Sequence, residues 1–485
     1  MSLYKKLFQQ TAIYGIATVV PRIFSFLLTP LYTDVLPEDE YGAVSIIFAW
    51  MAFFNVVLAY GMETAFFRFY NSDDKRSVLG TSTVSLFWSS IAFLVVGILT
   101  RGYLAKISGI DAEFITYNIW ILVLDALVII PFSRLRAEGR PIFYAVVKIG
   151  NVAVNLLLNL FFLTKLPDLA ASNPEGFFNS IFVEGFEIGY IFVSNLIASL
   201  LTFIVLLPHY FKINWNFDSA LWRKMMQYSI PVLIAGIAFV INETFDRIFL
   251  EQLLPADIAE SEVGIYSACY KLAVFMTLFA TAFRLGIEPF FFSHAKNENA
   301  PQTYANITKF FVIFGSFILL GVIVFSDILK VLMIRRDSYY EGMEVVPLVI
   351  MANFFLGIYH NLSVWYKLSD KTKIGAYISI IGAIVTIALN FLLIPTMSYM
   401  GSAIATIAAY GTMMMISYFL GNKYYPIPYD MKKICGYLGV SIMLSCIYFY
   451  YFRENYFVGG GVLIAFALFL YMNERETILR IVKRK

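Results

Sequence analysis

The chain has 485 residues, of which 60% are hydrophobic and only 14% are charged, and its mean hydropathy is +0.73. Soluble domains are about 45–50% apolar and about 25% charged, so the composition excludes an ordinary soluble protein and predicts a polytopic membrane protein. The formal net charge of +3 is too small to indicate a nucleic-acid-binding surface.

Apolar segments long enough to cross a bilayer follow one another along the whole chain. A membrane helix needs about 20 apolar residues to span the hydrocarbon core, and fourteen segments meet this requirement. The first follows a start with two lysines but has no small-residue cleavage site, so we expect a retained helix and not a signal peptide. The segments cover approximately residues 11–33, 43–69, 80–100, 114–135, 142–164, 188–208, 225–253, 263–292, 306–326, 345–368, 373–394, 401–421, 433–452 and 456–473.

The distribution of Lys and Arg predicts the orientation of these segments. With the N-terminus in the cytoplasm, 24 of the 36 basic residues fall in cytoplasmic connections, 7 in external ones and 5 inside the segments. Several external connections are acidic, such as residues 34–40 and 257–262. The positive-inside rule therefore predicts an even number of spans with both termini in the cytoplasm.

Short patterns recur in the same order in two parts of the chain, which predicts an internal repeat. Parallel repeats of six helices each, covering residues 1–210 and 211–424, would be related by an axis along the membrane normal. Residues 425–485 have no counterpart and are predicted to add two helices and a basic cytoplasmic tail. The recurrences pair Gly42 with Gly264, Glu63 with Glu288, and the interval from Gly139 to Asn159 with that from Asp370 to Asn390.

Five cations lie inside the apolar segments: Arg22, Lys148, Arg247, Lys271 and Arg284. A cation near the bilayer centre costs at least ~2.5–3.5 kcal/mol, so each requires an anionic partner or a wet cavity. Arg22, Lys148 and Lys271 have no acidic residue within one turn of the helix and are the better candidates for binding an anionic substrate. Snorkelling or capping of a neighbouring helix remains the structural alternative for Arg22.

Local acidic partners suggest a structural role for the other cations. Glu243 and Arg247 share a helix face, and so do Arg284 and Glu288. For Arg247, a structural pair and a ligand contact both remain open.

Glu63 and Asp125 are the other acidic residues inside the apolar segments that we consider for a functional role. Glu63 and Arg68 occupy the matching end of the second segment, and we predict structural or gating ion pairs at these repeat-related positions. Asp125 lies alone in the fourth segment and either pairs with Lys148 or holds a coupling ion.

Motifs of known catalytic or cofactor-binding chemistry are not found. There is no phosphate-binding loop, nucleophile elbow or metal-ligand spacing, and Cys269, Cys435 and Cys446 lie in apolar runs without CxxC spacing. We therefore expect no enzymatic activity, no cofactor, no metal site and free cysteines packed as small hydrophobes.

Several stretches resemble the bacterial polysaccharide flippases, the O-antigen and capsule-unit translocases of the multidrug/oligosaccharidyl-lipid/polysaccharide exporter superfamily. The most specific is Phe245-Asp246-Arg247 with the residues that follow it. The resemblance spans nearly the whole chain and rests on residues 61–70, 228–231, 245–250, 263–271, 288–291, 390–395 and 401–406.

The resemblance implies an all-α fold of fourteen transmembrane helices in two lobes with a central cavity. It also implies alternating-access transport of a polyprenyl-pyrophosphate-linked oligosaccharide to the outer leaflet of the bacterial cytoplasmic membrane. Arg and Lys suit a pyrophosphate chemically, so Arg22, Lys148, Arg247 and Lys271 are the expected substrate-binding cations. Membrane lipids and other polysaccharide-assembly proteins are the expected partners.

Three alternatives remain open from the sequence. Cation-coupled multidrug exporters of the same superfamily commonly carry an acidic residue in the first helix, whereas this first segment carries Arg22 and reaches Asp34 only at its external end. Lipid II flippases have an arginine in the first helix, which Arg22 matches. A membrane glycan polymerase is less favoured, because the longest external connection covers only residues 165–187.

Overall fold

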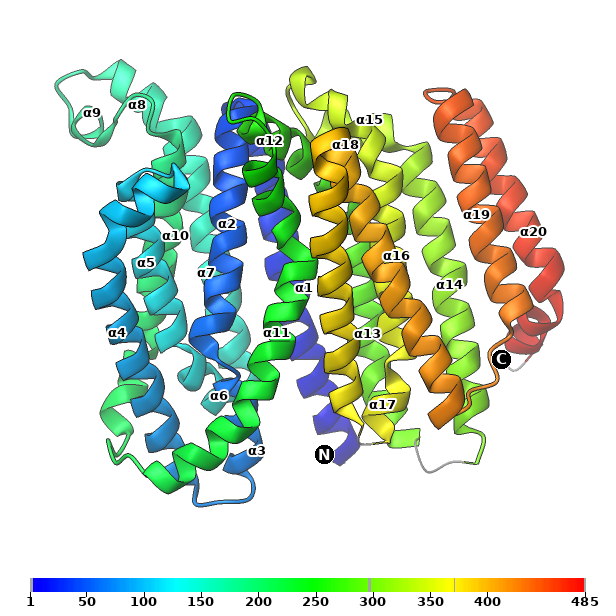
Figure 1. Cartoon of the computed structure of the whole chain (residues 1–485), viewed down its shortest axis with the longest axis horizontal. Coiled ribbons are helices and arrows are strands. Elements are labelled where there is room, and N and C mark those ends of the chain that lie inside the picture. Colours follow the sequence, from blue (N-terminus) through cyan, green and yellow to red (C-terminus); the bar gives the residue numbers. More distant parts are fainter. Residues whose placement is uncertain (1–2, 295–297, 370, 484–485) are drawn as a thin grey trace. The chain divides into compact units, whose positions relative to one another are not determined.

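The computed structural model describes residues 3–294, 298–369 and 371–483, and within these ranges the chain is helical and contains no strand. Its contacts divide it into two compact units, Met1–Gly264 and Ile265–Lys485 (Figure 1). The repeats predicted a division at residue 210. The packing boundary lies later because α11 (Ser219–Leu253) packs against α2, α3 and α4 of the first unit.

The first unit is built from long apolar helices joined by short connections. Apolar residues surround these helices on most faces, as expected where lipid replaces water and every backbone group must bond within its own helix. Asp74 and Asp218 cap the starts of α4 and α11 by accepting main-chain N–H groups. Besides α11, its helices are α1 (Leu3–Val35), α2 (Glu38–Ala59), α3 (Met62–Tyr70), α4 (Lys75–Ser108), α5 (Ala112–Leu127), α6 (Ile129–Ala137), α7 (Pro141–Leu160), η1 (Phe161–Lys165), α8 (Leu166–Ser172), α9 (Phe177–Ile181), α10 (Glu187–Leu206) and η2 (Leu207–Lys212).

The second predicted span is broken into α2 and α3 at Tyr60 and Gly61. Both residues have left-handed backbone conformations, with φ of 32° and 71°. A Cβ atom at Gly61 would lie 2.6 Å from the main-chain oxygen of Ser229 on α11. Glycine at this position therefore allows both the turn and the close approach of α11.

Gly42 and Gly264, which the sequence pairs as repeat-related positions, lie against each other in the structure. Gly42 is on α2, and Gly264 is on α12 (Ala259–Tyr270). A Cβ on Gly42 would lie 1.8 Å from the main-chain oxygen of Glu260, and one on Gly264 would lie 1.9 Å from that of Glu38. Small residues thus bring the two helix backbones into direct contact, as in other membrane helix pairs.

The second unit continues from α12 with the same kind of helix. It ends with two helices, α19 and α20, that the repeat does not contain. Its elements are η3 (Lys271–Ala273), α13 (Val274–His294), α14 (Ala300–Val324), α15 (Ser326–Met333), η4 (Asp337–Val345), α16 (Val346–Leu362), α17 (Val364–Leu368), α18 (Thr372–Tyr424), α19 (Met431–Tyr451) and α20 (Tyr456–Lys483).

Helix α18 folds back on itself and supplies two of the predicted spans. Its 53 residues keep helical geometry except at Ser398, where φ is 48° and ψ is −135°. Asn390 and Ser402 would be about 18 Å apart in a straight helix, yet the Ser402 hydroxyl donates to Asn390 Oδ1 at 2.7 Å. The ascending and descending halves are visible in Figure 1 as yellow and orange helices.

This hairpin accounts for the difference between predicted and observed helix counts. In the part of the chain that is described, 13 helices are long and apolar enough to cross a membrane, and α18 is counted once among them. Its two halves correspond to the predicted segments 373–394 and 401–421, so the chain is an all-helical, multi-pass membrane protein as predicted. The three cysteines are free, with Cys269 buried and Cys435 and Cys446 exposed on α19.

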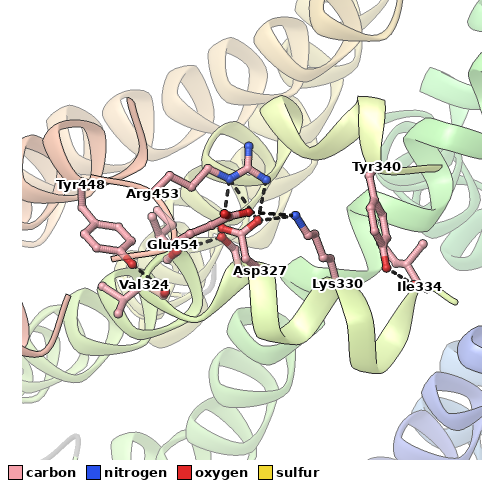
Figure 2. Close-up of polar contacts among 10 residues, drawn as sticks. Val324, Asp327, Lys330, Ile334, Tyr340, Tyr448, Arg453 and Glu454 are labelled. Carbon is pink, nitrogen blue, oxygen red and sulfur yellow. Dashed lines mark hydrogen bonds and ion pairs between the residues drawn. The ribbon is translucent and has the colours of Figure 1, made fainter. Parts of the chain in front are cut away.

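Polar clusters attach the α19–α20 hairpin to the rest of the second unit near both of its ends. At one end, the buried Glu474 carboxylate of α20 accepts hydrogen bonds from Lys309 on α14 at 2.8 Å, Lys433 at 2.9 Å and Tyr437 at 2.8 Å. At the other end, Arg453 donates to both oxygens of Asp327 on α15, at 3.0 and 2.9 Å (Figure 2).

Candidate functional site

Two of the predicted substrate-binding cations are exposed at positions inside membrane-length helices. Arg22 follows Pro21 on α1, within the apolar stretch Ile13–Val35. Lys271 begins η3, within the stretch Ala259–Glu288. An exposed side chain at such a position contacts either lipid or a polar environment. Contact of a cation with lipid is unfavourable, because moving a charge into the hydrocarbon core costs free energy. The exposure of both cations therefore favours a wet surface around them.

Lys148 and Asp125 lie near each other in the first unit. Lys148 Nζ lies 4.6 Å from the centre of the Phe132 ring on α6, a cation–π contact. Asp125 on α5 accepts a hydrogen bond of 2.8 Å from Ser199 on α10. The two charges attract each other, but among the described residues they form no ion pair. The structure thus brings the predicted partners together without direct contact.

Arg247 forms its ion pair with Asp246, its neighbour in sequence. Arg247 Nη1 lies 2.6 Å from Asp246 Oδ1, and both side chains are largely buried. The same nitrogen donates to the main-chain oxygen of Glu243 at 3.2 Å. Glu243, one turn earlier, contributes its backbone carbonyl, and the adjacent carboxylate of Asp246 supplies an ion pair. A buried cation held in this way is compensated locally.

Glu63 and Arg68 do not pair with each other in the described structure. Glu63 Oε1 forms an ion pair of 2.7 Å with Arg136 Nη1 on α6. The Arg68 guanidinium instead lies over the ring of Tyr228, 4.3 Å from its centre. Both residues project from the short helix α3, but Arg136 on a neighbouring helix reaches the carboxylate and Tyr228 on α11 covers the guanidinium.

Glu288 of the second unit likewise pairs across helices and not with Arg284. Its Oε1 lies 2.6 Å from Lys367 Nζ on α17. Arg284, Glu288, His360 and Lys367 all line one cavity of ≈ 20 Å³. A cavity of this volume has room for about one water molecule, so it is too small for a pyrophosphate or a sugar. Among the described ion pairs, Glu288 is thus bound by Lys367 and not by Arg284, and a structural or gating role for this set stays a prediction.

The ion pairs Glu63–Arg136 and Glu288–Lys367 occupy positions that the sequence repeat relates to each other. The basic partners could therefore have been found from the sequence. Glu63 and Glu288 were already paired by the repeat. Arg136 stands three residues before Gly139, and Lys367 stands three before Asp370, which begin the matching 20-residue intervals. Extending the repeat alignment by three residues would have identified Arg136 and Lys367, which intrahelical spacing alone does not reveal.

Buried asparagines also occupy equivalent positions in the two halves. Asn159 and Asn390 each donate to the main-chain carbonyl four residues earlier, at 2.8 and 2.7 Å. Asn159 Oδ1 accepts from the hydroxyl of Tyr32 on α1 at 3.0 Å, and Asn390 Oδ1 accepts from Ser402. The positions that the predicted repeat pairs therefore make similar polar contacts.

Comparison with known proteins identifies a family match in the first part of the chain. The family model described as "Polysaccharide biosynthesis protein" matches residues 7–134 and 179–285. A Haemophilus influenzae protein named "Lsg locus putative protein 1" is 20% identical over 296 residues, which cover 60% of this chain and 68% of that protein.

Solved structures of transporters share the fold. A lipid II flippase MurJ in an inward closed conformation aligns with a TM-score of 0.75 at 15% identity, over 96% of this chain and 100% of that one. An inward-facing multidrug resistance MATE family transporter aligns with a TM-score of 0.65 at 11% identity, over 85% and 94%. At these identities the likeness establishes the fold.

Proposed function

We propose that the chain is a member of the superfamily of polysaccharide flippases and exporters, which the family match and the shared fold support, and that it moves a lipid-linked oligosaccharide across the bacterial cytoplasmic membrane. The cargo would be an O-antigen, capsule or exopolysaccharide unit joined to a polyprenyl pyrophosphate. Its membrane-embedded tail and polar headgroup require a path with a wet, cationic surface beside lipid. Both termini of the protein would lie in the cytoplasm, as the distribution of basic residues predicts.

The observation that carries this proposal is the exposure of Arg22 and Lys271 inside membrane-length helices. A permanent cation at these positions is favourable where a passing anion or water offsets its insertion cost. Pyrophosphate supplies such an anion, and Arg can bind two of its oxygens at once. Lys148 and Arg247 are proposed as further cations for the headgroup, with Arg247 restrained by Asp246.

Transport by alternating access requires that the cargo bind two conformations with different affinity. The direction of transport then depends on removal of the product or on a coupled ion. We assign Asp125 as the candidate for such an ion, because its carboxylate accepts only from Ser199 among the described hydrogen-bond donors and lies near a single lysine. The ion pairs Glu63–Arg136 and Glu288–Lys367 are proposed to stabilise one conformation, while Arg68, Glu243 and Arg284 remain candidates for structural roles.

Transport assays on full-length protein in liposomes test this proposal directly. A fluorescent polyprenyl-pyrophosphate oligosaccharide is incorporated, and its arrival in the opposite leaflet is followed with a membrane-impermeant quencher. We expect Arg22→Ala and Lys271→Ala each to lower the transport rate by about tenfold or more, the size of one charge-assisted hydrogen bond. Lys106→Ala is the matched control, since this exposed lysine lies near the end of α4.

The variants are compared at equal reconstituted protein. Wild-type rates for both Arg22→Ala and Lys271→Ala would show that these cations do not handle the cargo. Loss of transport in the Lys106→Ala control would instead indicate a general effect of surface charge.

A lipid II-type flippase is the second candidate, favoured by the full-length structural likeness and by the arginine in the first helix. The same assay with lipid II as cargo separates the two, because the better cargo is transported faster at equal concentration. Export of an organic cation driven by a sodium or proton gradient, abolished by Asp125→Asn, would favour the multidrug-exporter alternative. Lengthening of the glycan during the assay would favour the polymerase.

A further inference from the structure

A basic pocket lies in the first unit, at helix ends and away from the intramembrane cations discussed above. Its volume is ≈ 480 Å³, and its lining includes Lys75, Arg134, Glu138, Arg140, His209 and Lys212. These residues come from the start of α4, the end of α6 with the connection that follows it, and η2. All lie at helix ends or connections that the positive-inside rule predicts to be on the cytoplasmic side.

The pocket carries an excess of positive charge. Four of its lining residues are Lys or Arg, and Glu138 is its single carboxylate. Glu138 is already engaged, because Oε1 lies 2.6 Å from Arg134 Nε and Oε2 lies 3.5 Å from Arg140 Nε. Three positive charges therefore remain uncompensated within the lining, and exposed Lys75 and Lys212 are two of the cations.

Two buried nitrogen atoms in this lining have no hydrogen-bond partner among the described residues. They are Arg134 Nη1 and His209 Nδ1. Leaving a buried polar group unsatisfied costs about 1–3 kcal/mol, more for a charged one, and such groups are uncommon in native structures. A guanidinium nitrogen can only donate, so the missing partner of Arg134 is an acceptor.

We propose that this basic pocket binds a phosphate group, carried either by the headgroup of an anionic membrane lipid or by a soluble phosphorylated compound. A phosphate offers several acceptor oxygens to Arg134 Nη1 and to an N–H at His209 Nδ1, and its charge offsets that of Lys75, Arg140 and Lys212. The volume admits a phosphate or pyrophosphate with part of its substituent. Basic pockets at the cytoplasmic ends of membrane helices are suited to anionic lipid headgroups.

The test compares a pocket variant with a charge-matched control on the same helix. Lys75→Gln with Lys212→Gln removes two cations of the pocket that are exposed and make no described ion pair. Arg101→Gln with Lys106→Gln removes the same charge near the other end of α4. Neither double variant alters a buried contact, so both are expected to fold.

Two binding measurements on the full-length protein distinguish the sources of the phosphate. Native mass spectrometry counts bound phosphatidylglycerol against phosphatidylcholine, and thermal-shift titration measures the affinity for inorganic pyrophosphate. We expect wild-type protein and the control to bind one of these anions about tenfold more tightly than the double variant with Lys75→Gln and Lys212→Gln.

Preference for phosphatidylglycerol assigns the site to a lipid headgroup, and a pyrophosphate response alone assigns it to a soluble compound. Equal binding of both anions by wild type and the pocket variant would overturn the proposal. Neither measurement involves transport, so the result is independent of the proposed flippase activity.

Discussion

Asp327 shows how one carboxylate is stabilised in its charged form outside the membrane-spanning helices. Partial burial by itself raises the pKa of this carboxyl, but hydrogen bonds from Arg453 and Lys330 act in the opposite direction and prevail, so the pKa lies below its usual value. Lys330 Nζ lies 2.6 Å from Asp327 Oδ1, and Glu454 lies 3.6 Å from the same nitrogen (Figure 2).

The lowered pKa of Asp327 predicts a specific dependence of stability on pH. A carboxyl whose pKa is lower in the folded state stabilises the fold above its unfolded pKa of about 3.9, and this contribution is lost as the pH falls through the folded-state value. Asp327→Asn should therefore lower the melting temperature near neutral pH, and its difference from wild type should shrink below about pH 4. Thermal unfolding of the purified protein at several pH values measures this difference.

Asp257→Asn is the control for that series, because Asp257 is exposed in the connection before α12 and makes no described ion pair. It should follow the wild-type curve at every pH. A difference between wild type and Asp327→Asn that stays constant down to the lowest pH would show that the charge of Asp327 is not what stabilises this cluster.

The sequence locates the charged residues inside the membrane segments, but it does not identify their partners on other helices. The cations Arg22, Lys148, Arg247, Lys271 and Arg284 were identified from the apolar segments around them, and the structure places each of them on a helix. Spacing within one helix suggested Glu288 as the partner of Arg284 and Glu63 as that of Arg68, but both carboxylates pair with residues of other helices. Spacing reports which residues share a helix face, but it contains no information about the neighbouring helix that supplies Arg136 or Lys367.

At the scale of elements, the α19–α20 hairpin depends on a buried ion network with α14. Glu474 is 4% exposed and lies between Lys309 and Lys433. Lys309 is also buried, so removal of the carboxylate charge leaves an uncompensated cation. Breaking a buried pair in this way costs about 3–5 kcal/mol, which would loosen the hairpin from the unit.

We therefore expect Glu474→Gln to lower the melting temperature and to accelerate proteolysis in the connection between α18 and α19. Arg475→Gln is the matched control, since Arg475 is adjacent in sequence but exposed. Peptide mapping after limited proteolysis locates the cleavage. Unchanged protection in Glu474→Gln would mean that apolar packing alone holds the hairpin in place.

The elements themselves were largely predictable, because membrane-length apolar runs have one main structural outcome. The fourteen predicted segments correspond to the helices of the structure within several residues. The breaks inside them were not predicted, since they depend on tertiary contacts. Gly61, for example, adopts its turn where α11 approaches, and the sequence gives no sign of that neighbour.

At the scale of the whole molecule, the predicted repeat relates two ion pairs, one from each half. The Glu63–Arg136 pair is exposed, with 48% and 41% of its side chains accessible, whereas the Glu288–Lys367 pair is less so, at 36% and 30%. Ion pairs gain strength as they leave water, so the second pair should contribute more. Arg284, which lines the same cavity, makes the local requirement for negative charge greater.

Charge exchange tests this difference between the halves. Glu288→Lys should lower both the melting temperature and the transport rate, because it places a third cation beside Lys367 and Arg284. Adding Lys367→Glu should restore much of both. The equivalent changes, Glu63→Arg and then Arg136→Glu, should have smaller effects. A double variant no better than Glu288→Lys alone would show that the two side chains do not act as a pair.

The back-folded helix α18 has a consequence for how the protein is made. Its two halves meet at the single non-helical residue Ser398, with helical geometry on either side and no intervening loop. Neither half can complete its polar contacts alone, because Asn390 finds Ser402 only after the chain has reversed. We therefore expect residues Thr372–Tyr424 to enter the bilayer as one helical hairpin, and an epitope tag or protease site inserted at the Ser398 turn should separate the two spans.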